Sequence, residues 1–342
     1  MNRSPTVMVA GAGVLGLTCA LALADAGCRV TVCDPGGANA SSVAAGMIAP
    51  VFEAVLDPSA RGHFDLLMAA RDLWPGLARR AGLYLDRTGA MAVGEDDWLE
   101  GLAAKFSALG LRANEIEATT ARSLAPGLSE VWPRALLTRE DWRVDAPSAL
   151  ESLRHEAEAA GVAFRPWRVS GKGNADVLLV ASGAACDLRE VAPELDQLSP
   201  IKGHIVRVAA PSTGAVVRGE GVYASPGLGM AFGASMEPGR SDDVIDPAVV
   251  QTLLAAGLTL FPGLSGQPVE ASTGVRAATV DGLPLVGWSQ EPGVMLAAGA
   301  RRNGWLLAPM VARMAVAYVL GQDVGDYAEL FDPRRRQTEG RA

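Results

Sequence analysis

The sequence contains few of the residues that build metal centres and disulfide frameworks. Its 342 residues include three histidines and four cysteines, Cys19, Cys28, Cys33 and Cys186. No two cysteines form a CxxC pair, and none has a histidine at metal-ligand spacing. We therefore expect no bound metal and no disulfide framework, and the cysteine usage favours a protein of the reducing cytoplasm.

An excess of basic residues is also absent. Lys and Arg total 30 against 38 Asp and Glu, which gives a formal net charge of -8. Proteins that bind nucleic acid or an anionic membrane present a basic surface. The overall balance therefore makes neither of them an expected partner.

One long uncharged stretch, Val7 to Ala24, follows Arg3 near the N-terminus. Hydropathy alone would allow it to be a signal peptide or a membrane span. Two features argue against both: the stretch contains glycines at a phosphate-binding spacing, and the strand-like segment Arg29 to Cys33 follows directly. We predict a cytoplasmic protein without a membrane span.

The residues that are present favour an α/β protein of two domains. The chain is 49% hydrophobic and has 39 glycines, and its length suggests about two domains of roughly 150 residues each. The patterns predict helices over 17–26, 60–81, 97–109, 146–160, 247–260 and 305–320. They predict strands over 6–10, 29–33, 83–93, 176–182 and 294–298, and an antiparallel group over 201–234.

The first helix begins with a dinucleotide-binding fingerprint. The segment Gly11-Ala-Gly13-Val-Leu-Gly16 lies between a predicted strand and helix, and Asp34 ends the next strand. In such a motif the glycines allow a tight turn, a close approach of the pyrophosphate and close helix packing, while the acid binds ribose hydroxyls. The alternative is a glycine-rich packing site without ligand. The motif disfavours NADP but does not separate NAD from FAD.

Three further blocks resemble a known family. They are Ser41 to Pro50, Thr273 to Gly287 and Gly299 to Pro309, supported by Pro200 to Gly203, Tyr223 to Pro226 and Gly233 to Gly239. Together with the fingerprint they resemble the D-amino acid oxidase superfamily of FAD-dependent oxidoreductases, most closely the glycine oxidases of thiamine (thiazole) biosynthesis. The resemblance extends over nearly the whole chain.

The resemblance implies the fold and the domain organisation. A Rossmann-type FAD-binding domain would comprise residues 1–82, 141–185 and 265–342. A substrate domain with a mixed or antiparallel sheet would comprise 83–140 and 186–264. FAD would be bound non-covalently, since no cysteine follows Cys186 to attach it.

The resemblance also implies the cofactor-binding residues. The fingerprint would contribute Gly11, Gly13, Val14, Leu15, Gly16 and Asp34. The flavin and its ribityl chain would be lined by Ser42, Ala45, Gly46 and Met47, and the adenine half would lie near Val169 and Gly183. The pyrimidine end of the flavin would be covered by Arg302, Asn303, Gly304, Trp305 and Leu306.

The substrate pocket implied by the resemblance contains Tyr223, Met236, Arg276 and Arg302. A guanidinium binds a carboxylate through two parallel hydrogen bonds. We expect Arg302 to be this anchor because its block adjoins the flavin, with Arg276 second and Tyr223 as a further donor. The alternatives are that either arginine pairs with an internal acid and that Met236 only packs in the core.

Three departures from the family pattern affect the site. Residues 168–176 are short where relatives have a longer β-meander, which weakens the match of Val169. Ala300-Arg301 stands where glycine oxidases usually have His-Phe, and Gly221 stands where a histidine often faces the pocket. The last two departures leave the identity of the amine open.

The expected function is FAD-dependent oxidative deamination of a small amino acid, glycine or a similar one. Hydride transfer to the flavin would give an imine that hydrolyses to an oxo acid and ammonia, with O2 as acceptor. The alternative within the superfamily is a dehydrogenase of D- or secondary amino acids that reduces a quinone. An NAD-dependent dehydrogenase or a non-catalytic dinucleotide sensor is the alternative from another class. Self-association is left open.

Overall fold

A six-stranded sheet begins with the βαβ unit that the fingerprint predicts. The computed structural model describes residues 4–37 and 39–335. In it β1 (Thr6–Ala10) and β2 (Arg29–Cys33) are parallel, and α1 (Val14–Asp25) connects them. The strand order is β16-β17-β9-β1-β2-β8. The other strands are β8 (Ala163–Arg165), β9 (Val177–Val180), β16 (Leu285–Trp288) and β17 (Val294–Ala298).

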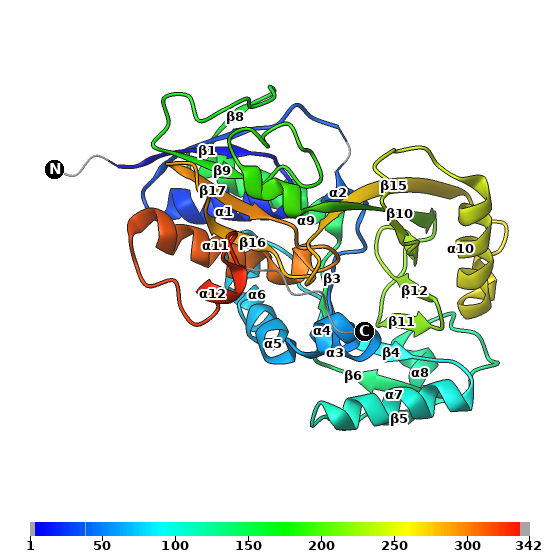
Figure 1. The fold of residues 1–342 in the computed structure, drawn as a ribbon. Coiled ribbons are helices and arrows are strands. Elements are labelled where there is room, and N and C mark those ends of the chain that lie inside the picture. The colour runs from blue at the N-terminus through cyan, green and yellow to red at the C-terminus, as the bar shows by residue number, and fades with distance from the viewer. Residues whose placement is uncertain (1–3, 38, 336–342) are drawn as a thin grey trace.

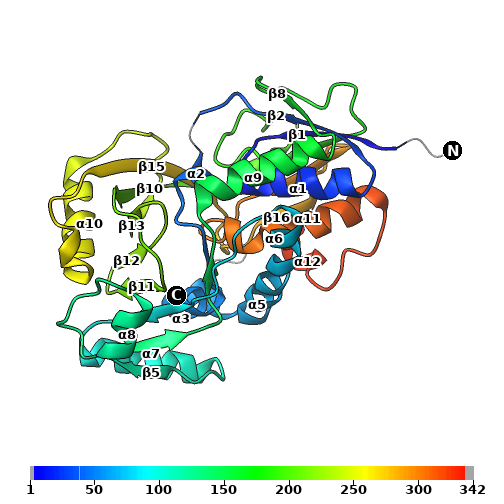
Figure 2. The same ribbon diagram turned by 180° about the vertical axis from the view of Figure 1, so that it is seen from behind.

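Helices cover one face of this sheet. Leucine, valine and alanine side chains of α1, α9 (Ala146–Ala159) and α11 (Gly304–Leu320) form one buried cluster with the strands, and α5 (Phe64–Asp72) and α6 (Trp74–Arg80) extend it. Figure 2 shows α9 and α1 side by side across the sheet. Loops and the short helix η1 (Pro193–Gln197) contribute to a second cluster with other strand side chains, which include Leu178, Val180 and Leu296.

A second, nine-stranded sheet forms the other half of the molecule (Figure 1). Its path is β14-β10-β13-β12-β11-β4-β6-β5, and β15 pairs with β10. All its pairs are antiparallel except β11 with β4. The strands are β4 (Ala90–Ala92), β5 (Asn114–Glu117), β6 (Arg134–Thr138), β10 (Ser199–Val208), β11 (Val216–Gly219), β12 (Val222–Ser225), β13 (Met230–Gly233), β14 (Glu237–Pro238) and β15 (Val269–Ala278).

The two faces of this sheet pack against different helices. On one face α10 (Pro247–Leu260) approaches the strands closely, because a Cβ added to Gly257 would lie 2.2 Å from the Phe232 ring. On the other face α3 (Pro50–Leu56) and α7 (Asp96–Ala108) pack through Phe52 and Phe106. The site lies on this second face, toward the six-stranded sheet.

β15 links the two sheets. It pairs with β10 over ten residues, from Ser199 opposite Ala278 to Val208 opposite Val269. At its C-terminal end Ala278 bridges to Ala300, and the Arg301 N–H donates to the Ala277 carbonyl at 2.9 Å. The long strand therefore carries residues of the second sheet to the segment that begins α11.

Shorter elements complete the chain. They are α2 (Ala40–Val43), β3 (Met47–Ile48), α4 (Pro58–Arg61), α8 (Ala118–Leu124), β7 (Trp142–Arg143), η2 (Pro262–Leu264) and α12 (Ala328–Phe331). β3 and β7 form a separate two-stranded sheet. This pair places α2 and α3 on either side of the junction between the two larger sheets.

The predicted fold class is confirmed, and several elements match residue for residue, including β1, β2, α10 and β17. The prediction of one helix over 60–81 is wrong. The chain forms α4, α5 and α6 there, because Pro75 at the start of α6 cannot continue the preceding helix. The strands predicted over 83–93 reduce to β4 and one bridge, Asp86 with Arg143.

Two other expectations concern the chain as a whole. Within the described residues, no helix combines the length and the apolar character needed to cross a membrane. The division into two domains at the boundaries given above stays a prediction. β15 lies in the nine-stranded sheet, although its residues fall in the range assigned to the cofactor domain.

The cap of α9 gives a first test of this fold. The Asp145 side chain accepts the Ser148 N–H at 3.1 Å, which satisfies a free donor of the first turn. Because losing such a cap costs about 0.5–2 kcal/mol, Asp145→Ala should lower the Tm by roughly 1–3 °C. The measurement is thermal unfolding followed by circular dichroism. Glu151→Ala, at an exposed position of the same helix, is the control, and an equal loss in both variants would contradict the capping role.

Candidate functional site

The N-terminus of α1 opens into a cavity of about 520 Å³. Gly13 is the residue before the helix and provides no side-chain cap, so the first backbone N–H groups point to the cavity. The Val14 N–H donates to Ser41 Oγ of α2 at 3.0 Å. Unpaired N–H groups and the positive end of the helix dipole make this end a site for a phosphate group.

The three fingerprint glycines have different surroundings. A Cβ at Gly11, whose φ is +113°, would lie 2.5 Å from the Ala181 carbonyl oxygen, and one at Gly16 would lie 2.1 Å from the Gly11 oxygen. A Cβ at Gly13 would meet only Ser41 Oγ, at 3.1 Å. Gly11 and Gly16 therefore close the turn, while Gly13 leaves the space that a diphosphate needs.

Asp34 lies in the same cavity at the end of β2. Its carboxylate accepts the Ala12 N–H at 2.6 Å and the Gly36 N–H at 2.7 Å. These two bonds fix the carboxylate and leave lone pairs on both oxygens for the hydroxyls of a ribose. The cavity thus fits the adenosine diphosphate half of a dinucleotide.

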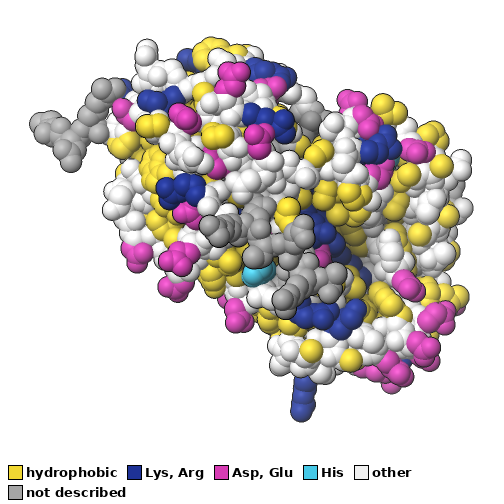
Figure 3. Space-filling model, in the orientation of Figure 1, with side chains coloured by type: hydrophobic (Ala, Val, Ile, Leu, Met, Phe, Trp, Pro, Cys, Tyr) yellow, Lys and Arg dark blue, Asp and Glu magenta, His cyan; other side chains and the backbone are white. Residues whose placement is uncertain are grey.

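A second cavity of about 320 Å³ adjoins the first. Both are lined by Ala40, Gly274 and Arg276, so they meet at β15. Small residues from 44 to 46 form one wall, and the strands β10 to β13 contribute the opposite wall. Figure 3 shows Lys and Arg side chains gathered in the recess between the two halves of the molecule.

Arg276 of β15 occupies a space that Gly203 leaves open in β10. Gly203 and Gly274 are register partners, and a Cβ on Gly203 would lie 2.2 Å from Arg276 Nη1. The guanidinium makes only long contacts, 3.4 Å to the Ser235 carbonyl and 3.5 Å to Met236 Sδ. Burial lowers the pKa of Arg276. No carboxylate of residues 4–37 or 39–335 pairs with it.

Tyr223 lies beside Arg276 on the same wall. It is the register partner of Gly233, and a Cβ on that glycine would lie 2.4 Å from the phenol oxygen. Burial raises the pKa of Tyr223, so the side chain keeps its proton and can donate it in a hydrogen bond. A half-buried cation and a phenol donor in one cavity form a binding site for a carboxylate.

Arg302, at the entry to α11, has internal acidic partners. Its Nη2 lies 3.0 Å from Glu53 Oε1, and its Nη1 lies 3.6 Å from Asp57 Oδ2. The Glu53 charge raises the pKa of Arg302. Asp57 also pairs with Arg301. Pairing with an internal acid, the alternative considered for Arg302, is therefore present in the structure.

Most residues proposed from the sequence line one of the two cavities. The first contains Gly11, Gly13, Val14, Leu15, Asp34, Gly183 and Gly304. The second contains Ala45, Gly46, Met47, Tyr223, Met236, Arg276, Arg302, Asn303 and Trp305. Their contacts with a cofactor or substrate stay predictions.

Four of the proposed residues line neither of these two cavities. Gly16 closes the turn, and Leu306 is buried in the helix cluster. Ser42 hydrogen-bonds the Asn39 carbonyl as part of the α2 cap. Val169 packs with Cys33 in the cluster that includes Leu178 and Val180.

Several lining residues escaped the sequence analysis. Ser41 adjoins the proposed Ser42 in the sequence. Which of the two serines faces the α1 N-terminus depends on the orientation of α2, and the structure places Ser41 there. Glu53 and Arg218 both line the second cavity. The one available signal for Arg218 was hairpin pairing, since it lies opposite Tyr223 across a turn that contains Gly221.

Comparisons with known proteins agree with this geometry. A family model described as "FAD dependent oxidoreductase" matches residues 6–318. A glycine oxidase of Pseudomonas aeruginosa is 29% identical over 99% of this chain and 100% of its own length. The crystal structure of glycine oxidase from Geobacillus kaustophilus superposes with a TM-score of 0.81 at 25% identity, covering 98% of this chain and all of that one.

A longer relative also matches. The bifunctional protein ThiO/ThiG of Trichormus variabilis is 28% identical over 97% of this chain. The chain spans about half the length of that relative, 55%.

Gly13 provides a test of the cofactor cradle. Gly13→Val should abolish bound FAD, because the branched side chain would project into the space for the diphosphate while the backbone, at φ -74°, tolerates it. FAD content is measured by absorbance of the purified protein. Gly101→Val, in α7 with no atom near its Cβ, is the control and should retain FAD. A Gly13→Val protein with full FAD would contradict the assignment.

Asp57 provides a test by pH. Burial alone would raise its pKa, but the Ser59 hydrogen bond and the charges of Arg301 and Arg302 lower the pKa below its usual value. A lowered folded-state pKa means that the stabilisation is complete above the unfolded value of about 3.9 and is lost as pH falls through the folded value.

Asp57→Asn should therefore reduce stability at pH 7 by about 1.5–3 kcal/mol, and the difference from wild type should narrow below about pH 4. Thermal unfolding across this pH range measures it. Asp187→Asn removes a matched but exposed arginine pair and should have little effect. A difference that is independent of pH would argue against the ionic contribution.

Proposed function

Since the chain belongs to the FAD-dependent oxidoreductase family, we propose that it oxidatively deaminates a small amino acid, glycine or one of similar size. FAD is its cofactor. Relatives named glycine oxidase, matched over nearly the full chain, support this choice of reaction. The oxidised substrate would leave as an imine, which water converts to an oxo acid and ammonia.

The two cavities divide the cofactor between them in this proposal. Gly13, the α1 N-terminus and Asp34 hold the adenosine diphosphate half, and the small residues 44–46 with Asn303 and Trp305 line the space for the flavin. FAD supplies the acceptor for the hydride equivalent lost from the substrate α-carbon. The chain then has to bind, orient and shield the amino acid.

The observation that carries the proposal is the half-buried guanidinium of Arg276 at the junction of the cavities. It has no acidic partner among the described residues, and Gly203 leaves the space in which it lies. We propose Arg276, in place of Arg302, as the carboxylate anchor. Arg302 already pairs with Glu53 and Asp57, so a substrate carboxylate would have to compete with them.

Tyr223 and Arg302 would complete the binding site. The protonated phenol of Tyr223 donates a hydrogen bond to the same carboxylate that Arg276 holds. Arg302, fixed by Glu53, adds positive charge without leaving its ion pair. Met236 covers this region, and its sulfur lies 3.5 Å from Arg276 Nη1.

O2 is the proposed electron acceptor, in keeping with relatives whose names are oxidases. Self-association and location in the cell are not part of the proposal. Hydrogen peroxide formed in step with amino acid consumption would support O2. Turnover only with an added quinone would replace it with the dehydrogenase alternative.

Arg276 variants test the anchor. Because charge-assisted hydrogen bonds contribute roughly 1.5–3 kcal/mol each, Arg276→Ala should lower kcat/KM for glycine by about 10²-fold or more. Arg276→Lys keeps the charge but loses the planar fork, so it should fall between wild type and Arg276→Ala. Arg302→Lys should lower kcat/KM for glycine by a smaller factor than Arg276→Lys does. The measurement is kcat/KM at equal FAD occupancy. Arg154→Ala, on the exposed face of α9, is the control.

Two results would count against the proposal. An unchanged KM for glycine in Arg276→Ala at full FAD occupancy would move the anchor to Arg302. Equal turnover of methylamine and glycine would contradict an amino acid substrate, because an amine without a carboxylate makes no use of either arginine.

A further inference from the structure

Arg218 of β11 is a buried cation that has no ion-pair partner among the described residues. Its side chain lines the second cavity, and the residue is 3% exposed. Nε and Nη2 are shielded from water and have no hydrogen-bond acceptor. Over residues 4–37 and 39–335 no carboxylate forms an ion pair with it. Such a group is costly to bury unless something pairs with it.

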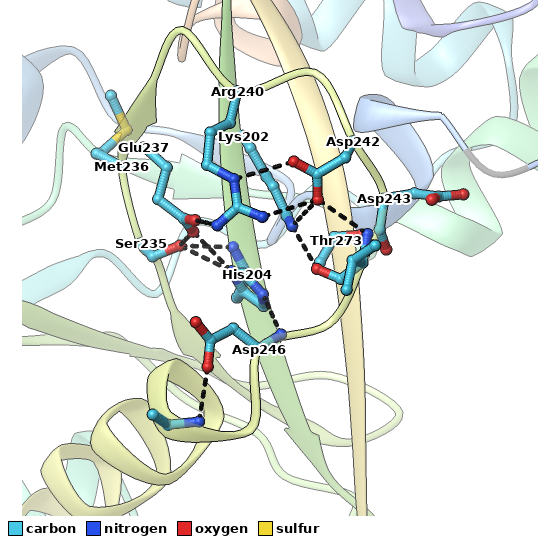
Figure 4. A network of polar contacts seen from close by, with 12 residues as sticks. Lys202, His204, Ser235, Met236, Glu237, Arg240, Asp242, Asp243, Asp246 and Thr273 are labelled. Carbon is cyan, nitrogen blue, oxygen red and sulfur yellow. Dashed lines mark hydrogen bonds and ion pairs between the residues drawn. The ribbon is translucent and has the colours of Figure 1, made fainter.

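Two other basic side chains of the same sheet, Lys202 and His204 of β10, are fully buried and have polar partners. Lys202 binds Asp242, as Figure 4 shows, and also the Val244 carbonyl. His204 contacts Ser235 and Glu237 through Nδ1, and its Nε2 accepts the Asp246 N–H at 3.0 Å. The fold thus satisfies both of these side chains, whereas two nitrogens of Arg218 lack an acceptor among the described residues.

Burial lowers the pKa of Arg218, and the charges of Glu53 and Asp141 oppose that shift without forming an ion pair with its guanidinium. Its Cζ lies 5.6 Å from the centroid of the Phe52 ring and 5.7 Å from that of Tyr223, so the two rings provide only cation–π contacts. Glu53 pairs with Arg302 through Oε1, and its buried Oε2 has no hydrogen-bond partner among the described residues. Asp141 accepts the Val51 and Phe52 N–H groups at 2.8 and 3.1 Å.

The charges that line the second cavity are unequal. Arg218, Arg276 and Arg302 face a single lining carboxylate, Glu53. Glu53 pairs with Arg302, Asp57 is shared between Arg301 and Arg302, and a substrate α-carboxylate would pair with Arg276. Arg218, on the other side of Tyr223, then has no carboxylate of the described residues in direct contact with its guanidinium.

We propose that Arg218 binds a second acidic group of the substrate, so that the preferred substrate is a small amino acid with a further carboxylate. This inference rests on the proposed function and narrows its substrate class. Tyr223 lies directly opposite Arg218 in the β11–β12 register and also borders Arg276. One short molecule can therefore span the two guanidinium groups.

The cavity has space for the larger substrate at this end. Gly219 and Gly221 line it next to Arg218, and a Cβ at Gly221 would meet no atom within 4 Å. A side chain at that position would occupy this space. The space left at Gly221 and the Arg218 guanidinium therefore lie at the same end of the cavity.

The experiment compares acids with their amides, which have nearly the same shape and differ in one charge. The FAD-loaded enzyme is assayed with aspartate and asparagine, both enantiomers of each, and with glycine. Wild type should favour an aspartate enantiomer over the matching asparagine by at least about 10-fold in kcat/KM, as one charge-assisted pair contributes. Arg218→Met should remove that preference, and Arg218→Lys should retain part of it.

A binding measurement gives a readout apart from turnover. Succinate and its monoamide, succinamate, are titrated into the FAD-loaded protein by calorimetry. Wild type should bind succinate at least about 10-fold more tightly, and Arg218→Met should bind the two alike. Arg134→Met makes the same change in net charge at the partly exposed first residue of β6, and it should behave as wild type.

The outcomes separate this inference from the proposed function. Turnover of glycine with no preference for aspartate, or a preference that survives Arg218→Met, would overturn the inference alone. If no amino acid is oxidised, the proposed function fails, and succinate binding that depends on Arg218 would still support a site for two acidic groups. Loss of FAD in both Arg218 variants would assign Arg218 to the cofactor site and overturn the inference.

Discussion

A half-buried guanidinium at the junction of two sheets, with no carboxylate partner among the described residues, is the constraint on which this site depends. Arg276 can lie there only because Gly203 has no side chain, and Gly203 is held opposite Gly274 by the ten-residue pairing of β10 with β15. The end of β15 is in turn fixed to the segment before α11. Long-range strand pairing therefore sets the position of a single charge relative to the dinucleotide cradle.

The arrangement separates two tasks. The cradle at α1 uses backbone N–H groups and one carboxylate, which bind a cofactor through parts common to any dinucleotide. The second cavity uses arginines on β11, β15 and the start of α11, each in a different electrostatic state. Among the described residues, Arg302 forms ion pairs, Arg276 hydrogen-bonds only neutral groups, and Arg218 contacts two aromatic rings without a direct ion pair. Differences in pairing, more than differences in residue type, distinguish their proposed roles.

The sequence predicts the parts of this site that depend on local chemistry. The fingerprint and Asp34 could be located because glycine spacing and strand–helix order are local properties, and β1, β2, α10 and β17 have clear hydrophobic patterns. The breaks in 58–80 escaped prediction because the helical periodicity of the apolar residues continues across them. The pairing of Arg302 with Glu53 joins residues 249 positions apart, and no local pattern reports such a contact. Arg218 is a similar case. Whether it has an ion-pair partner depends on several elements that are distant from it in the sequence.

Reduction of the bound flavin in the absence of O2 tests the central claim most directly, because it detects substrate oxidation without depending on the final acceptor. FAD-loaded wild-type protein is mixed anaerobically with glycine or with either enantiomer of aspartate, and the oxidised flavin absorbance is followed. The account predicts bleaching by at least one of these amino acids in wild type, and a much higher half-saturating concentration in Arg276→Ala. Flavin that no carboxylated amine bleaches, or bleaching unaffected by Arg276→Ala, would contradict it.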